Sequence, residues 1–241
     1  MNIVWAICRR DLLAAFTAPM AWLVLACWTL LVNGVFMMSL YQWHNTPGSS
    51  LPLFATSFSY GIFFLVLLAP AVTMGSFTQE RAQGSMQLLL TVPIREWQLV
   101  LGKFAAAFAV LLSLVAATAV QPLTLLFVSE VHGAHLAAGY LGLVLACALF
   151  AALGVWISLL VDSAIVAYVI TFAAIAVLIM LGALGNQGWY GALGQTMGLT
   201  SRSGPFFDGE VRLGSVTWFL ALTVAALTMS HAALSARRIH G

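Results

Sequence analysis

The chain has 241 residues, of which 62% are hydrophobic and only 7% are charged, and its formal net charge is +2. A soluble domain carries about 25% charged residues, so this composition argues against a water-soluble protein and indicates a membrane protein. The small net charge also argues against a nucleic-acid-binding protein, which needs a dense basic face. The three cysteines lie far apart with no CxxC pair, so the sequence predicts neither a disulfide framework nor a zinc site.

The first 17 residues mix aromatic and charged side chains ahead of a long apolar run. Trp5 and Phe16 lie on either side of Arg9, Arg10 and Asp11 in this segment. Such an amphipathic pattern is typical of a helix that lies at the membrane interface. The apolar run that follows is too long for the apolar region of a secretory signal peptide, so we interpret it as a retained membrane span.

Six stretches are long and apolar enough to cross a bilayer, which takes about 20 residues of helix. Barrel strands would alternate apolar and polar side chains, whereas these stretches are apolar on every face. The predicted fold class is therefore an all-α membrane protein, with one transmembrane domain over residues 1–241. The predicted spans are about 18–41, 58–77, 99–128, 136–161, 164–184 and 213–234.

The distribution of basic residues predicts the orientation, because cytoplasmic segments carry an excess of Lys and Arg. Six spans place both termini on one side, and we expect that side to be the cytoplasmic side of a bacterial inner membrane. The external segment from about Gly185 to Arg212 is rich in glycine and partly apolar, which predicts a re-entrant segment that dips back into the protein. Seven basic residues fall on the cytoplasmic side, Arg9, Arg10, Arg81, Arg95, Lys103, Arg237 and Arg238, and two on the other, Arg202 and Arg212.

The segment between the second and third predicted spans concentrates charge in an apolar chain. Helical phasing over residues 77–90 predicts an amphipathic helix that ends before Pro93, with a second helix starting at about Arg95. Gly84 within that helix would mark a bend or a close approach of another backbone. Periodicity alone favours a charged cytoplasmic loop that does no more than set the orientation of the protein in the membrane. The polar stripe of this helix comprises Glu80, Gly84, Gln87 and Thr91.

A resemblance to a known family changes that interpretation. The stretch "LLAPAVTMGSFTQERAQGSMQLLLTVPIREWQLVLGKF", residues 67–104, resembles the central signature of type-2 ABC exporter permeases. The N-terminal "CRRDLLAAFTAPMAWLVL" and the C-terminal segment ending in an Arg-Arg pair resemble the branch of gliding-motility and nitrous-oxide-reductase-maturation permeases. The matching positions of the central signature are Pro70, Met74, Glu80, Arg81, Gly84, Leu88–Leu90, Thr91, Pro93, Gly102 and Lys103.

The resemblance implies a transport subunit rather than an enzyme. Members of the family pair with a second permease copy or a paralogous permease, and with two copies of a cytoplasmic ABC ATPase that binds ATP and Mg²⁺. The chain itself has no GxxxxGK[ST] phosphate-binding loop. Further accessory subunits are compatible with this reading, and the substrate stays open, as does the choice between export and mechanical work. The resemblance implies that a coupling helix touches the ATPase through Glu80, Arg81, Gly84, Gln87 and Thr91, with a secondary contact at Asp162.

Polar residues within the spans are candidates for lining the translocation pathway, since polar groups in a bilayer face the protein interior. Bonding between helices is the alternative interpretation for each of them. By the same resemblance, the external segment offers Phe206, Phe207 and Asp208 as gate candidates. The pathway candidates are Asn33, Ser39, Gln121, Thr124 and Thr171.

Two other classes of protein are alternatives to the transporter. Eight tryptophans and the pair His132 and His135 suggest a haem- or metal-handling membrane protein, but the tryptophans are scattered and several lie near span ends, where aromatic residues gather anyway. An intramembrane hydrolase needs a Ser-His pair, paired aspartates or an HExxH motif in the spans, and none is present. We expect no catalytic residue, no metal and no cofactor on this chain.

Overall fold

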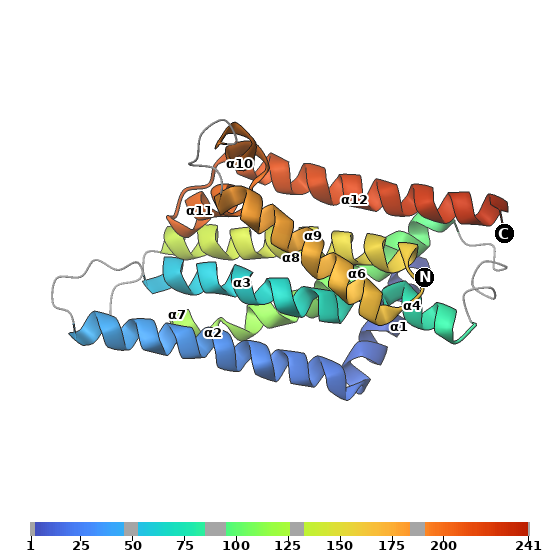
Figure 1. Cartoon of the computed structure of the whole chain (residues 1–241). Coiled ribbons are helices and arrows are strands. Elements are labelled where there is room, and N and C mark those ends of the chain that lie inside the picture. Colours follow the sequence, from blue (N-terminus) through green and yellow to red (C-terminus); the bar gives the residue numbers. More distant parts are fainter. Residues whose placement is uncertain (1–2, 46–52, 85–94, 126–132, 184–190, 241) are drawn as a thin grey trace.

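The computed structural model describes residues 3–45, 53–84, 95–125, 133–183 and 191–240, and every regular element among them is an α-helix (Figure 1). Six helical segments are long and apolar enough to span a membrane, which confirms the predicted fold class. The helices in chain order are α1 (Ile3–Thr17), α2 (Pro19–Asn45), α3 (Leu53–Thr73), α4 (Gly75–Ala82), α6 (Glu96–Ala117), α7 (Val120–Leu125), α8 (Gly133–Leu160), α9 (Ala164–Ala183), α10 (Gly191–Met197), α11 (Leu199–Phe207) and α12 (Leu213–His240).

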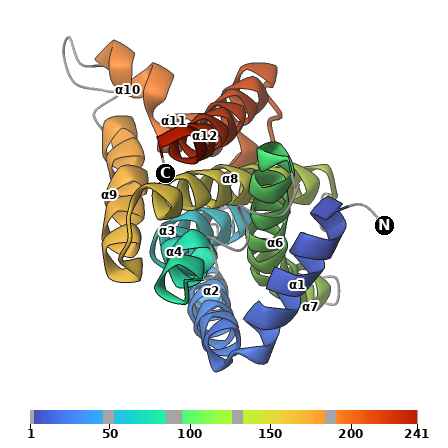
Figure 2. The ribbon, with the colours of Figure 1, turned by 90° about the vertical axis from the view of Figure 1, so that its right-hand side faces the viewer.

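Helix α8 lies at the centre of the bundle, where α3, α6, α9 and α12 surround it (Figure 2). Its span is 72% buried within the chain, against 17% for α9, which lies at the periphery. Glycines on α8 let its neighbours approach closely: a Cβ at Gly139 would collide with the ring of Phe58, and one at Gly154 with the side chain of Thr73. Small residues allow this close packing of helices in membranes.

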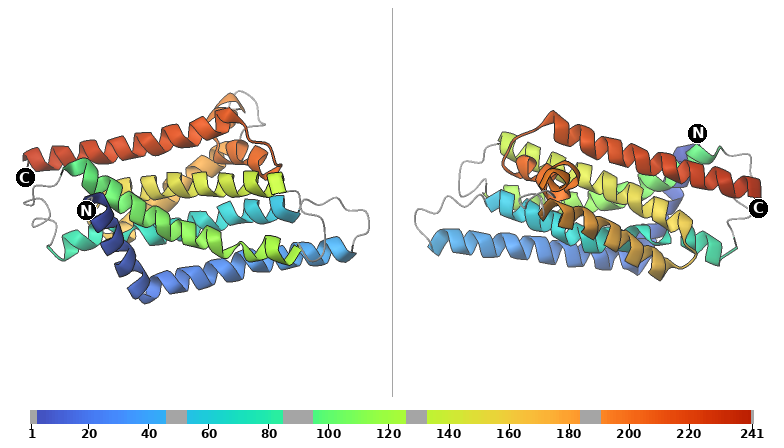
Figure 3. Two further views of the ribbon diagram at one scale, coloured as in Figure 1. Left: turned by 180° about the vertical axis from the view of Figure 1, so that it is seen from behind. Right: turned by 45° about the horizontal axis from the view of Figure 1, so that its top comes forward.

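Both chain termini lie at the same end of the bundle, together with α1 and α4 (Figures 1 and 3). The even number of predicted spans requires this arrangement. Helix α1 meets α2 at a sharp bend next to Ala18, and Pro19 occupies the first turn of α2, where its missing N–H costs nothing. The N-terminal helix predicted over residues 1–17 is thus present, while its position at a membrane interface stays a prediction.

The structure corrects one sequence-based helix prediction and adds a detail to another. The helix expected over residues 77–90 ends at Ala82, because Gly84 adopts a left-handed backbone with φ +69° and terminates it. No atom lies within 4 Å of a Cβ added at Gly84, so close backbone approach is not the reason for this glycine. The third predicted span corresponds to the candidate span Glu96–Pro122, within which a turn at Thr118 and Ala119 separates α6 from α7.

The segment before the last span, which the sequence predicts to be external, folds back onto the bundle. Helix α11 packs on α3, α8 and α9, while α10 packs on α9 and α11. Phe206 packs against Gly142 of α8, and the ring of Phe207 stacks on Phe58 of α3 with centroids 5.8 Å apart. The depth of this segment relative to lipid stays a prediction.

Candidate functional site

A charged cluster lies at the end of the bundle that holds both termini, around α4. Glu80 and Arg81 are neighbours on α4, yet their side chains make ion pairs on opposite sides of it. Glu80 pairs toward α1 and α6, whereas Arg81 pairs toward the turn between α8 and α9. Both side chains are only 13% exposed, so their charges are directed mainly into this chain.

Lys103 of α6 is the centre of the first half of the cluster. Its Nζ lies 2.9 Å from Glu80 Oε1 and 3.2 Å from Asp11 Oδ2, and it donates a 2.6 Å hydrogen bond to the carbonyl oxygen of Ser76. The side chain is 3% exposed, and its ammonium lies 5.0 Å from the centroid of the Phe77 ring. A lysine this buried needs such partners, because an unpaired charge in a low-dielectric interior is strongly unfavourable.

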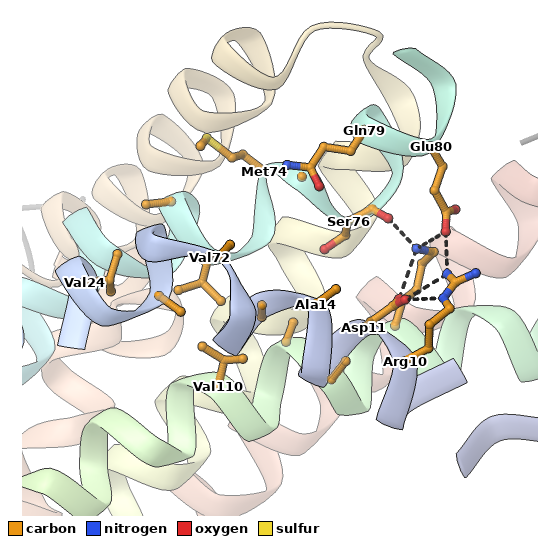
Figure 4. A pocket seen from close by; sticks show the side chains of 18 of the residues that line it. Arg10, Asp11, Ala14, Val24, Val72, Met74, Ser76, Gln79, Glu80 and Val110 are labelled. Carbon is orange, nitrogen blue, oxygen red and sulfur yellow. Dashed lines mark hydrogen bonds and ion pairs between the residues drawn. The ribbon is translucent and has the colours of Figure 1, made fainter. Parts of the chain in front are cut away.

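Arg10 of α1 completes this half of the cluster. Its Nη2 lies 2.6 Å from Glu80 Oε1 and 2.8 Å from Asp11 Oδ1 (Figure 4). Burial lowers the pKa of Arg10, but the hydrogen bonds and attraction from Asp11 and Glu80 outweigh it, so the pKa rises above its ordinary value. Two cations thus face two anions, and the four side chains sum to no net charge.

Arg81 forms the second half of the cluster by capping the end of α8. Its Nη1 donates 2.7 Å bonds to the carbonyl oxygen of Val161 and to Asp162 Oδ1, and its Nη2 donates to the carbonyl oxygen of Leu159. The last carbonyls of a helix have no partner within the helix, and a cation there also interacts favourably with the helix dipole. Arg81 therefore joins α4 to the turn between α8 and α9.

Ser158 adds a second connection between α4 and α8. The backbone N–H of Phe77 donates a 3.0 Å bond to Ser158 Oγ, which in turn donates a 3.1 Å bond to the carbonyl oxygen of Met74. These bonds satisfy backbone groups in the first turn of α4, which has no side-chain cap of its own. Helix α4 is consequently bonded to α1, α6 and α8 at once.

The predicted coupling residues are only partly brought together. Glu80, Arg81 and Asp162 belong to the cluster, Gly84 lies exposed beyond the end of α4, and Gln87 and Thr91 fall outside the described residues. The expectation that these side chains contact a partner stays a prediction.

Sequence reasoning missed that Arg10, Asp11 and Lys103 share a site with Glu80. The sequence assigns Arg10 and Asp11 to the predicted N-terminal interfacial helix and Lys103 to the family signature, but predicts no contact among them. The available signal was Lys103 itself, the one charged residue in the predicted span 99–128. Such a residue demands a partner of opposite charge.

The pathway candidates occupy different environments. Gln121 is buried and joins three helices, because Ser57 Oγ donates a 2.9 Å bond to its Oε1 and its Nε2 donates a 3.3 Å bond to the carbonyl oxygen of Val32. Thr171 of α9 is buried as well, and its hydroxyl has no hydrogen-bond partner among the described residues. Asn33 and Ser39 are half-buried on α2, while the side chain of Thr124 is outside the described part of the chain. Whether any of them lines a pathway stays a prediction.

The gate candidates divide into core and surface. Phe206 and Phe207 are buried in the contact of α11 with α3 and α8, whereas Asp208 is exposed at the C-terminal end of α11. Within the described ranges, no three His, Cys, Asp or Glu side chains lie close enough together to hold a metal ion. His135 packs against Gly209, and its predicted companion His132 lies outside those ranges.

One protein-family model matches the greater part of the chain. The model of the family described as "ABC-2 family transporter protein" matches residues 5–201. No curated protein matches the chain. The matched range includes α1 from its third residue onward, α4, α6 and the turn after α8, and therefore the whole charged cluster.

Proposed function

This chain belongs to the ABC-2 family of transporters, and on that premise we propose that it is the membrane-spanning permease subunit of an ATP-driven exporter. The chain is a multi-pass membrane protein with six candidate spans. In the proposed complex it forms a dimer with a second permease, and two copies of a cytoplasmic ATPase dock on the end that holds the termini. The likeness to the gliding-motility and nitrous-oxide-reductase-maturation branch belongs to this proposal.

The observation that carries the proposal is the way α4 is bonded to the bundle. It lies at the end of the chain's second span, and in the proposed complex it is the coupling helix that receives the movement of the ATPase. A short helix can pass on a displacement only if it is held firmly to the helices that must move. Glu80 holds α4 to α1 and α6, and Arg81 holds it to the α8–α9 turn.

In the proposed complex the ATPase contacts exposed residues on and next to α4 rather than the paired charges of Glu80 and Arg81. Gln79 is exposed on α4, Gln83 and Gly84 are exposed just beyond its end, and Asp162 is 88% exposed on the neighbouring turn. In this arrangement Glu80 and Arg81 position the coupling helix, and the surface residues contact the partner. Complementary polar surfaces of this kind set the register and the rate of encounter of two proteins.

ATP hydrolysis is assigned to the partner, because the chain carries no phosphate-binding loop of the GxxxxGK[ST] type. The end with α1 and α4 is placed in the cytoplasm, as the excess of basic residues on that side indicates. The permease pair then switches between two arrangements as the ATPases close on ATP and Mg²⁺ and reopen.

The test is to isolate the tagged chain in mild detergent from cells that carry its own genes. We expect a polypeptide with a phosphate-binding loop to copurify and the complex to hydrolyse MgATP, while the chain alone does not. The double variant Glu80→Gln with Arg81→Gln is expected to lose the ATPase, or to keep it while ATP hydrolysis no longer depends on the permease.

A matched control lies at the opposite end of the molecule. Glu210 and Arg212 form an exposed ion pair 2.8 Å apart, and the double variant Glu210→Gln with Arg212→Gln makes the same change in charge. This control should retain the ATPase and its activity. The proposal is wrong if no such ATPase copurifies, or if the two double variants behave alike.

A further inference from the structure

A cavity of about 570 Å³ lies in the elbow between α1 and α2, closed by the end of α3, by α4 and by α6 (Figure 4). Its volume is in the range of sites for small ligands, about 300–1,000 Å³. The function proposed above uses some residues of its charged end but assigns no ligand to the cavity itself. The exposed residues Arg10, Ala14 and Gln79 on its rim show that it opens to the surface of the chain.

The walls of the cavity are apolar at one end and charged at the other. Figure 4 shows Val24, Val72 and Val110 at the apolar end. Small side chains usually let membrane helices pack in direct contact. Here alanines from α1, α2, α3 and α6, together with Ala18 at the bend, surround an opening instead: Ala14, Ala18, Ala21, Ala71, Ala106 and Ala107.

The charged end carries two cations and two anions within one network. Arg10 is 52% exposed and Asp11 22% exposed, so a guanidinium and a carboxylate can both be reached from the cavity. Because the four charges balance, an anionic headgroup gains no net attraction here. A headgroup with one phosphate and one ammonium matches the pair, with the phosphate beside Arg10 and the ammonium beside Asp11.

We propose that this cavity binds one phospholipid with a zwitterionic, amine-bearing headgroup, of the phosphatidylethanolamine type. One acyl chain follows the alanine-lined walls toward Val24 and Val110, and the remainder of the lipid stays in the bilayer. The bound lipid fills the elbow between α1 and the first span. It thereby supports the position of α1, whose Arg10 pairs with Glu80 of α4 and whose Asp11 pairs with Lys103 of α6.

The test uses the full chain in nanodiscs made from equal parts of phosphatidylethanolamine, phosphatidylglycerol and phosphatidylcholine, followed by native mass spectrometry. We expect one phosphatidylethanolamine to remain per chain after the other lipids are stripped. The variant Ala107→Phe fills the cavity and should lower this retention about tenfold. Arg10→Gln removes the phosphate partner and should lower it by a similar factor, because one charge-assisted hydrogen bond contributes about 1.5 kcal/mol or more.

Matched controls come from the same two helices. Ala116 is exposed on α6 and Arg9 is exposed on α1, and neither lines the cavity. Ala116→Phe and Arg9→Gln should retain the lipid as the unmodified chain does. The proposal is overturned if phosphatidylglycerol or phosphatidylcholine is retained preferentially, if no lipid is retained, or if Ala107→Phe and Arg10→Gln match their controls. Because the readout is lipid binding, the outcome does not depend on the ATPase.

Discussion

Replacement of Lys103 by methionine tests whether the charged cluster holds three helices together. The substitution removes three contacts of Nζ, to Glu80, Asp11 and the Ser76 carbonyl, and leaves two carboxylates with one cation fewer. Loss of one partner from a buried ion pair costs about 3–5 kcal/mol. Arg10 still compensates both carboxylates, so we expect the lower limit, about 3 kcal/mol of unfolding free energy.

A double-mutant cycle separates this coupling from general damage. Glu80→Gln alone should cost about 2 kcal/mol, and the double variant about 3–4 kcal/mol rather than the sum, which gives a coupling energy of about 1–2 kcal/mol. The assay is unfolding of the purified chain by SDS in mixed micelles, followed by circular dichroism. Arg9→Met, an exposed change on α1, is the control and should stay within about 0.5 kcal/mol. Additivity of the two single variants within about 0.5 kcal/mol would refute the reasoning.

Three further predictions concern the surroundings of the cluster. Arg81→Ala should lower the unfolding free energy by about 3 kcal/mol, because two charged hydrogen bonds to the carbonyls at the end of α8 are lost. Asp162→Ala should lower it by less than about 1 kcal/mol, since that carboxylate is largely exposed. Equal costs of the two variants in SDS unfolding would contradict this. Gly84→Ala should destabilise the folded chain by about 1 kcal/mol through the positive φ alone, and Gly84→Asn should destabilise it by less. A thermal melt in which the asparagine variant is the less stable of the two would argue against a left-handed residue at this position. Burial and the neighbouring Asp11 raise the pKa of Cys8, so less of its thiol is ionised at pH 8. In a variant with the other two cysteines changed to serine, alkylation of Cys8 at pH 8 should therefore be slower than alkylation of glutathione. Equal rates, followed by mass spectrometry, would contradict the burial.

Much of the fold could be predicted because the bilayer imposes simple rules on a sequence. A chain with 7% charged residues must expose apolar surface, and the length of its apolar runs predicts six membrane spans, the number of candidate spans among the described residues. The same count places both termini at one end, as the structure has them. These properties are local in the chain, so they can be read without knowing which helices are neighbours.

The end of α4 marks the limit of periodicity as a guide. The polar stripe fitted a helix through Gln87 and Thr91, but the helix ends at Ala82, two residues before the left-handed Gly84. A glycine just past the last helical turn is a common termination signal, so the sequence held the information. Periodicity reports which face of a helix is polar, and it does not report where the helix stops.

The site itself was decided by tertiary structure. Composition and family likeness pointed to Glu80 and Arg81, but both were expected to face a partner. Arg10 and Glu80 are 70 residues apart in sequence, Arg81 and Asp162 are 81 apart, and Lys103 and Asp11 are 92 apart. Only the packing of α1, α6 and α8 around α4 brings those groups within hydrogen-bond distance. The sequence by itself determined that this is a six-span membrane protein with charges gathered at one end, because hydrophobic length and charge are local properties. Which way each charge points depends on contacts between distant segments, and only the folded bundle supplies those.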